Sequence, residues 1–162
     1  MLKYVDTLVG FREIPDEISL CINISNCPNN CEGCHSSYLK EDIGTPLTYI
    51  ELKNLIEANK GITCVCFMGG DKEPWEISRL AKLIKEDYNL KVGWYSGKDE
   101  FFKGLDFLKF DYIKIGHYNK DKGPIDNENT NQRMYSLHHT LDGCVKFINI
   151  TNKFWKQHGN ED

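Results

Sequence analysis

Three cysteines are grouped on one short segment of this 162-residue chain, in the stretch Cys27-Pro-Asn-Asn-Cys31-Glu-Gly-Cys34. Thiolates at this spacing can reach three irons of a single cubane cluster, and Pro28 and Gly33 suit the turn between them. A cluster used only for electron transfer usually has four cysteine ligands, whereas three leave one iron open to an exchangeable ligand. The segment therefore indicates a redox iron–sulfur cluster that binds a small-molecule cofactor.

Other uses of these thiols are open on spacing alone. A zinc ion could be held if His35 or a distant cysteine completed the site, a fourth cysteine could complete an electron-transfer cluster, and the three thiols could be unrelated. No second Cys-x-x-Cys or His-x-x-x-His pair follows downstream. This absence disfavours a zinc knuckle without excluding it.

Composition limits the class of protein and its partners. The formal net charge is -4 and the basic residues are scattered, so no sequence-wide positive field is available for nucleic acid or an anionic membrane. Met1 to Phe11 lacks the apolar run of a secretory signal, and no stretch reaches the roughly 18 apolar residues of a membrane span. We therefore expect one domain over residues 1–162, located in the cytoplasm, where seven cysteines are better used for metal than for disulfides.

The elements that must position the cysteines alternate between strand and helix patterns. Residues 18–24 alternate apolar and polar side chains, as in a half-buried strand, and lead directly into the cysteine segment. Thr48 and Glu51 form a capping box that predicts the start of a helix. Further strands are predicted at 63–68, 91–95, 111–115 and 145–151, and further helices from Pro74 to Tyr88 and over 100–108.

This alternation predicts an α/β fold with mostly parallel strands. Four or five βα units in so short a chain indicate an open, incomplete (β/α) barrel, since the full eightfold barrel typically needs about 250 residues. Active sites of such folds lie at the carboxyl ends of the strands, where the cysteine segment is expected. The polar segment 118–132 is predicted to be a long functional or mobile loop.

A second motif follows the next predicted strand, in Met68-Gly69-Gly70-Asp71. Glycines allow the backbone to approach a ligand closely, and a carboxylate suits an ammonium group. The two motifs together resemble those of the radical S-adenosylmethionine superfamily, in which an acidic turn at this place helps to bind the amino group of the cofactor. Here Asp71 stands for the more usual glutamate.

The finer resemblance is to the small activating proteins of anaerobic ribonucleotide reductase. It rests on Glu32 to His35, on the Trp94-Tyr95-Ser96-Gly97 turn, and on Gly123-Pro124 with the later Thr-Asn-Gln-Arg of residues 130–133, and it spans about residues 11–150.

The resemblance implies a [4Fe-4S] cluster on the three cysteines, with S-adenosylmethionine on the open iron and at Gly69, Gly70 and Asp71. His35 and Ser96 are further candidates for cofactor contacts. Reductive cleavage would give a 5'-deoxyadenosyl radical that converts a glycine of the reductase's large subunit to a glycyl radical. An electron donor such as flavodoxin or ferredoxin is also implied. Action on another glycyl-radical protein or a small molecule, and a zinc-stabilised interaction module without enzymatic activity, are the alternatives.

The other cysteines have simpler interpretations. Cys64 and Cys66 lie two residues apart on a predicted strand, and Cys21 has apolar neighbours, so all three are expected to pack as small core residues. Cys144 has no partner visible in the sequence, and we predict no role for it.

Overall fold

The structure is a computed structural model that describes residues 1–155. Its strands form a single eight-stranded sheet in the order β3-β1-β2-β4-β5-β6-β7-β8. The strands are β1 (Lys3–Gly10), β2 (Ser19–Ile24), β3 (Thr45–Pro46), β4 (Cys64–Met68), β5 (Lys91–Tyr95), β6 (Tyr112–Ile115), β7 (Arg133–His139) and β8 (Val145–Asn149). The helices are α1 (Tyr49–Ala58) and α2 (Pro74–Asp87), with 3-10 turns at Ser37–Lys40, Phe107–Lys109 and Thr151–Phe154.

The predicted barrel of mostly parallel strands is wrong. Three of the strand pairs are parallel, namely β2–β4, β4–β5 and β5–β6. Four are antiparallel, namely β1–β2, β1–β3, β6–β7 and β7–β8. With two α-helices in the described part of the chain, the fold is a mixed sheet rather than a helix-rich barrel. The parallel strands form its centre, and antiparallel strands extend it on both sides.

One expected helix that does not form and two strands that were not predicted account for the difference. The helix predicted over residues 100–108 is an irregular segment ending in the turn Phe107–Lys109, in which Gly104 has φ +83°. Its Phe101 and Phe107 rings pack against Phe147 of β8, with centroids 5.0 and 5.4 Å apart. Aromatic packing onto the added strands thus replaces the helical turn there. The strands β1 and β7, which bring most of the antiparallel pairing, were not among the predicted elements.

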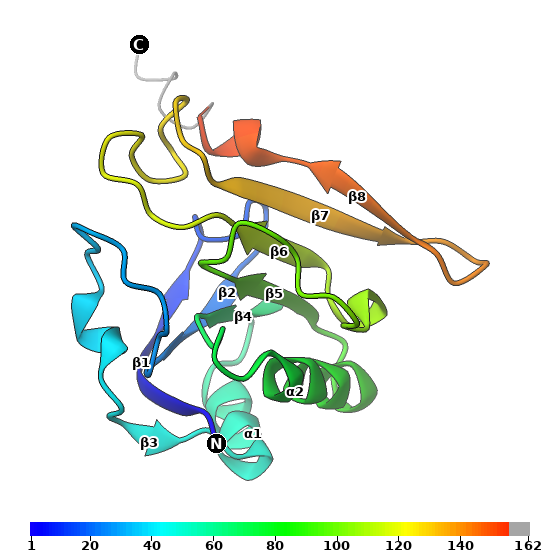
Figure 1. Cartoon of the computed structure of the whole chain (residues 1–162). Helices are drawn as coiled ribbons and strands as arrows, with labels where there is room; N and C mark the ends of the chain where they lie inside the picture. Colours follow the sequence, from blue (N-terminus) through cyan, green and yellow to red (C-terminus); the bar gives the residue numbers. More distant parts are fainter. Residues whose placement is uncertain (156–162) are drawn as a thin grey trace.

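The two helices pack on one face of the sheet (Figure 1). Strand alternation directs Leu20, Ile22, Val65, Phe67, Val92 and Trp94 toward the buried helical residues Leu52, Ile56, Ile77, Leu80, Ala81 and Ile84. The start of α1 is confirmed, because the Thr48 side chain accepts a hydrogen bond from the backbone N–H of Glu51. Pro74 opens α2, as expected of a proline in the first helical turn.

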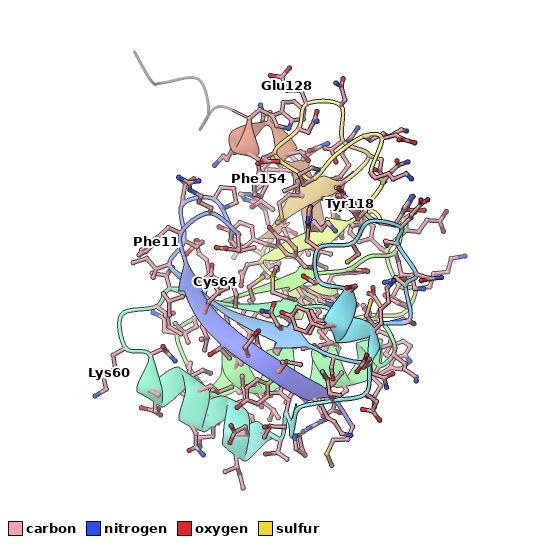
Figure 2. The ribbon with its side chains drawn as sticks, turned by 90° about the vertical axis from the view of Figure 1, so that its left-hand side faces the viewer. Phe11, Lys60, Cys64, Tyr118, Glu128 and Phe154 are labelled. Atoms are coloured by element: carbon pink, nitrogen blue, oxygen red, sulfur yellow. The ribbon has the colours of Figure 1, made fainter. Side chains whose placement is uncertain are left out.

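The opposite face carries a second apolar cluster. Its buried members are Ile14, Cys21, Cys64, Cys66, Tyr112, Met134, Ile150 and Phe154. The prediction that Cys21, Cys64 and Cys66 are core residues is therefore confirmed, and burial raises the pKa of the Cys66 thiol well above its usual range. Figure 2 shows Cys64 near the middle of the view, with Phe154 above it and Tyr118 above it and to its right.

A buried carboxylate ties the amino ends of the parallel strands together. Glu17 accepts hydrogen bonds from Lys91 Nζ at 2.6 Å, Thr63 Oγ1 at 2.5 Å and Tyr112 OH at 2.8 Å. Burial opposes the charged form, but the donors of Lys91, Thr63 and Tyr112 outweigh it, so the pKa of Glu17 is lowered. The cysteine segment lies at the other end of these strands, where their carboxyl ends meet.

None of the helices in the part of the chain that the structure describes is long and apolar enough to cross a membrane.

Candidate functional site

The parallel centre of the sheet brings four chain segments to one edge. The last pairs of the ladder are Asn23 with Met68, Met68 with Tyr95, and Tyr95 with Lys114. Because parallel strands end at the same edge, the loops that follow β2, β4 and β5 meet there, beside the end of β6. In Figure 1 the light-blue segment that carries the cysteines lies to the left of the sheet.

The loops enclose a cavity of about 150 Å³. Its wall includes Cys27, Cys31, Cys34, Gly69, Asp71 and Lys114. The three cysteines are partly exposed and form no disulfide. The structure thus brings together two motifs that lie about one βα unit apart in the sequence.

The cysteine segment is held by backbone hydrogen bonds at its start. The N–H of Asn26, which has φ +60°, donates to Glu41 O, and the N–H of Cys27 donates to Leu39 O, both at 2.9 Å. Partial burial raises the pKa of Cys27, with the negative charge of nearby Asp71 contributing in the same direction. A metal that replaced the thiol proton would remove this cost, because the metal ligand is the thiolate.

Three lysines from separate parts of the chain also hold the segment. Lys72 Nζ donates to Asn26 Oδ1 at 3.3 Å, and Lys40 Nζ donates to Asn30 Oδ1 at 3.0 Å. Lys120 forms an ion pair of 2.5 Å with Glu32, although both of these side chains are largely exposed. Each such exposed contact contributes little alone, about 1 kcal/mol or less, but together they connect the segment to three other parts of the chain.

Asp71 is the centre of the polar contacts at this edge. The residue is 5% exposed, and its carboxylate accepts three hydrogen bonds from two other loops. Ser96 Oγ donates to Oδ1 at 2.6 Å, and Oδ2 accepts from Gly97 N–H at 2.7 Å and from Asn29 Nδ2 at 2.6 Å. Asp71 therefore fastens the cysteine segment and the turn after β5 to the turn after β4.

The two glycines before Asp71 adopt conformations that favour glycine, with φ +109° at Gly69 and +96° at Gly70. A Cβ on Gly70 would stand 2.6 Å from Ile77 Cδ1, so α2 packs directly on this turn. Gly69 N–H donates to Tyr95 O at 3.1 Å, and Gly69 O accepts from Trp94 Nε1 at 2.8 Å. The turn is fixed to β5 on one side and to α2 on the other.

Three of the predicted contact residues do not line this cavity. His35 is exposed, and its ring lies 5.6 Å from that of Tyr118, itself a residue of the wall. Ser96 is buried and its hydroxyl is bound to Asp71. Gly70 does not line the cavity either. The cysteines, Gly69 and Asp71 are thus brought together, whereas Gly70, His35 and Ser96 stand behind or beside them.

Sequence reasoning missed Lys114, which lies on β6 and lines the cavity. Its Nζ donates to Gly116 O at 2.9 Å and to Ser96 O at 3.3 Å. Burial lowers its pKa to about 8. A lysine between two isoleucines of a short apolar strand was the available signal, because lysine is rarely buried without a reason.

Cys31 also faces a second, more open cavity of about 380 Å³. Its wall includes Asn30, Lys98, Asp99 and His117. His117 Nδ1 lies 2.7 Å from Asp99 Oδ1, and the hydrogen bonds from His117 lower the pKa of Asp99. The cysteine segment can therefore be approached from two sides.

The donor set fits an iron–sulfur cluster. Three thiols with no disulfide line one cavity, and thiolates are the usual ligands of such clusters. Within residues 1–155, no three His, Cys, Asp or Glu side chains are grouped so as to hold a single metal ion. In a cubane cluster the cysteines bind different irons, so they need not converge on one point.

Comparison of the chain with protein-family models, with curated proteins and with solved structures found no significant match.

Proposed function

We propose that this protein is a radical S-adenosylmethionine enzyme that activates anaerobic ribonucleotide reductase by generating a glycyl radical on the large catalytic subunit. The observation that supports this best is the shared cavity of Cys27, Cys31, Cys34, Gly69 and Asp71. The proposal also places the protein in the cytoplasm, where thiols are kept reduced.

The cysteines would hold a [4Fe-4S] cluster, and the turn after β4 would bind S-adenosylmethionine. When bound, the two groups supply one-electron reductive cleavage of the sulfonium, which leads to removal of a hydrogen atom from glycine. The chain's own residues would bind and orient these two groups and exclude water from them. The positive φ values of Gly69 and Gly70 favour glycine and shape the turn that presents Asp71 to the cavity.

Asp71 would serve two purposes in this site. Its carboxylate already accepts from Asn29, Ser96 and Gly97, and thereby fixes the loops around the cavity. Oδ1 accepts only one of these hydrogen bonds, and a carboxylate oxygen has two acceptor sites. A second donor, such as the amino group of the cofactor, can therefore bind there.

The first test is anaerobic reconstitution with iron and sulfide. We expect a brown cluster in the wild type and in Cys144→Ala, whose thiol is exposed and lies outside the site. Cys31→Ala should lose the cluster and the release of methionine from S-adenosylmethionine under reducing conditions. A reconstituted protein that binds zinc but no cluster would support the non-enzymatic interaction module instead.

The partner requires a second measurement. The reduced protein with S-adenosylmethionine, mixed with the large subunit of an anaerobic ribonucleotide reductase, should give a glycyl radical signal in electron paramagnetic resonance. Cleavage of S-adenosylmethionine without that signal would contradict the assignment of this partner. It would favour the same chemistry on another glycyl-radical protein or on a small molecule.

A further inference from the structure

Lys114 is a buried cation on the wall of the cysteine cavity. It follows Ile113 on β6, and its side chain is directed to the sheet face away from the helices, over the ring of Tyr95. Only 7% of the residue is exposed. A lysine in this position has little water around its ammonium group, so its charge must be stabilised by the protein or by a ligand.

The protein supplies dipoles to this ammonium group but no directly bound anion. Its contacts are the carbonyl oxygens of Ser96 and Gly116, and the Tyr95 ring with its centroid 5.6 Å away. Lys114 forms no ion pair with any residue in 1–155. An ammonium group has three donors, so one N–H is left over after the two carbonyls.

The negative groups that favour its charged form lie around the cavity. Asp71 has the largest effect, and Asp99 contributes in the same direction. Asp71 is itself held by three neutral donors. Cys31 and Cys34 are on the wall with Lys114, so negative charge placed on their sulfur atoms would lie near the unpaired cation.

We propose that Lys114 is the counter-charge of the cluster held by Cys27, Cys31 and Cys34, and that it favours the reduced form of that cluster. This inference rests on the proposed function. Thiolate ligands make such a cluster anionic, and reduction adds one more negative charge. A fixed cation nearby stabilises the reduced form more than the oxidised form, because the Coulomb energy grows with the charge that it faces.

The test is an anaerobic redox titration of the reconstituted protein with dithionite and no S-adenosylmethionine, followed by electron paramagnetic resonance. In Lys114→Met we expect the equilibrium constant for cluster reduction to fall about tenfold, which is about 59 mV for a one-electron couple. Lys114→Arg keeps the charge and should stay close to the wild type. Lys146→Met, which removes an exposed lysine on β8, should leave the potential unchanged.

A purely structural role predicts a different pattern. If Lys114 served only to bind the carbonyls of Ser96 and Gly116, its loss would lower stability and leave the potential where it was, which would overturn the inference. If Lys114→Met does not fold, Lys114→Gln takes its place, since the amide retains N–H donors without the charge. The same fall in the equilibrium constant is expected.

The carboxylate of S-adenosylmethionine is the other anion that could face Lys114. Equilibrium binding of S-adenosylmethionine to the oxidised cluster separates the two sources. Weaker binding in Lys114→Met with an unchanged potential would refute the cluster as the counter-charge. Failure of the wild type to assemble any cluster would refute both this inference and the proposed function, whereas an active cluster with no shift refutes only the inference.

Discussion

Replacing Asp71 by asparagine tests whether this carboxylate fastens the three loops of the site. Asparagine has nearly the same shape but only one acceptor oxygen. If that oxygen keeps the bond from Ser96, the new NH₂ group faces the donors of Gly97 and Asn29, which Oδ2 now accepts at 2.7 and 2.6 Å. Hydrogen bonds to a charged group contribute about 1.5–3 kcal/mol each. Because Asn29 can turn toward solvent, we expect a total loss of about 3 kcal/mol.

Urea unfolding of the metal-free protein measures this loss, with Asp121→Asn as the matched control. Asp121 is exposed, and its side chain makes no hydrogen bond or ion pair with other residues in 1–155, so the control should stay within about 0.5 kcal/mol of the wild type. Alkylation of Cys27 should also become faster in Asp71→Asn, because the loop loses its attachment through Asn29. An Asp71→Asn protein with wild-type stability and unchanged Cys27 alkylation would show that the carboxylate does not hold the loops.

Three further substitutions test the scaffold around the site, each by urea or thermal unfolding. Gly70→Ala should destabilise the protein by about 2–4 kcal/mol, because its Cβ would collide with Ile77 and its φ is +96°. Gly61→Ala is the control, since it has open space at φ +92° and should cost only about 1–2 kcal/mol. Equal losses of stability in the two variants would contradict the clash with Ile77. Glu17→Gln should remove part of the pH dependence of the free energy of unfolding. Because the pKa of Glu17 is lowered in the folded protein, its contribution to stability is complete above its pKa in the unfolded chain and is lost as the pH falls through its folded pKa. A variant whose stability falls with acid in the same way as the wild type would contradict this role of Glu17. Thr48→Ala should cost about 1 kcal/mol through loss of the α1 cap, and no change would mean that another group caps the helix.

The centre of the sheet could be predicted from the sequence because its strands carry local patterns. Residues 18–24, 63–68, 91–95 and 111–115 are short apolar or alternating runs that end in turn residues, and β2, β4, β5 and β6 fall on them. The segment 118–132 contains no strand or helix, as expected for a loop. These local patterns do not show whether a strand pairs parallel or antiparallel with its neighbour in the sheet.

The antiparallel additions depend on contacts between residues far apart in the chain. The segment over residues 100–108 shows why, since Phe101 and Phe107 pack with Tyr135 and Phe147 of the β7–β8 hairpin, whose residues lie far along the chain. The lysine of β6 was missed for a related reason. The two isoleucines beside it indicate a buried strand, but only the pairing of β7 alongside β6 shows that this strand is internal to the sheet.

The site shows the same division between motif and arrangement. The types and spacing of Cys27, Cys31 and Cys34 are local, but their distance from the glycine turn is set by the Asn29–Asp71 hydrogen bond between residues 42 positions apart. Ser96 then connects the two buried charges, since its hydroxyl donates to Asp71 and its carbonyl accepts from Lys114. A carboxylate and an ammonium group thus bind the same residue of one turn, and the third N–H of Lys114 has no partner among residues 1–155. The motif determines which ligand chemistry is available, and these long-range polar contacts determine where it can occur.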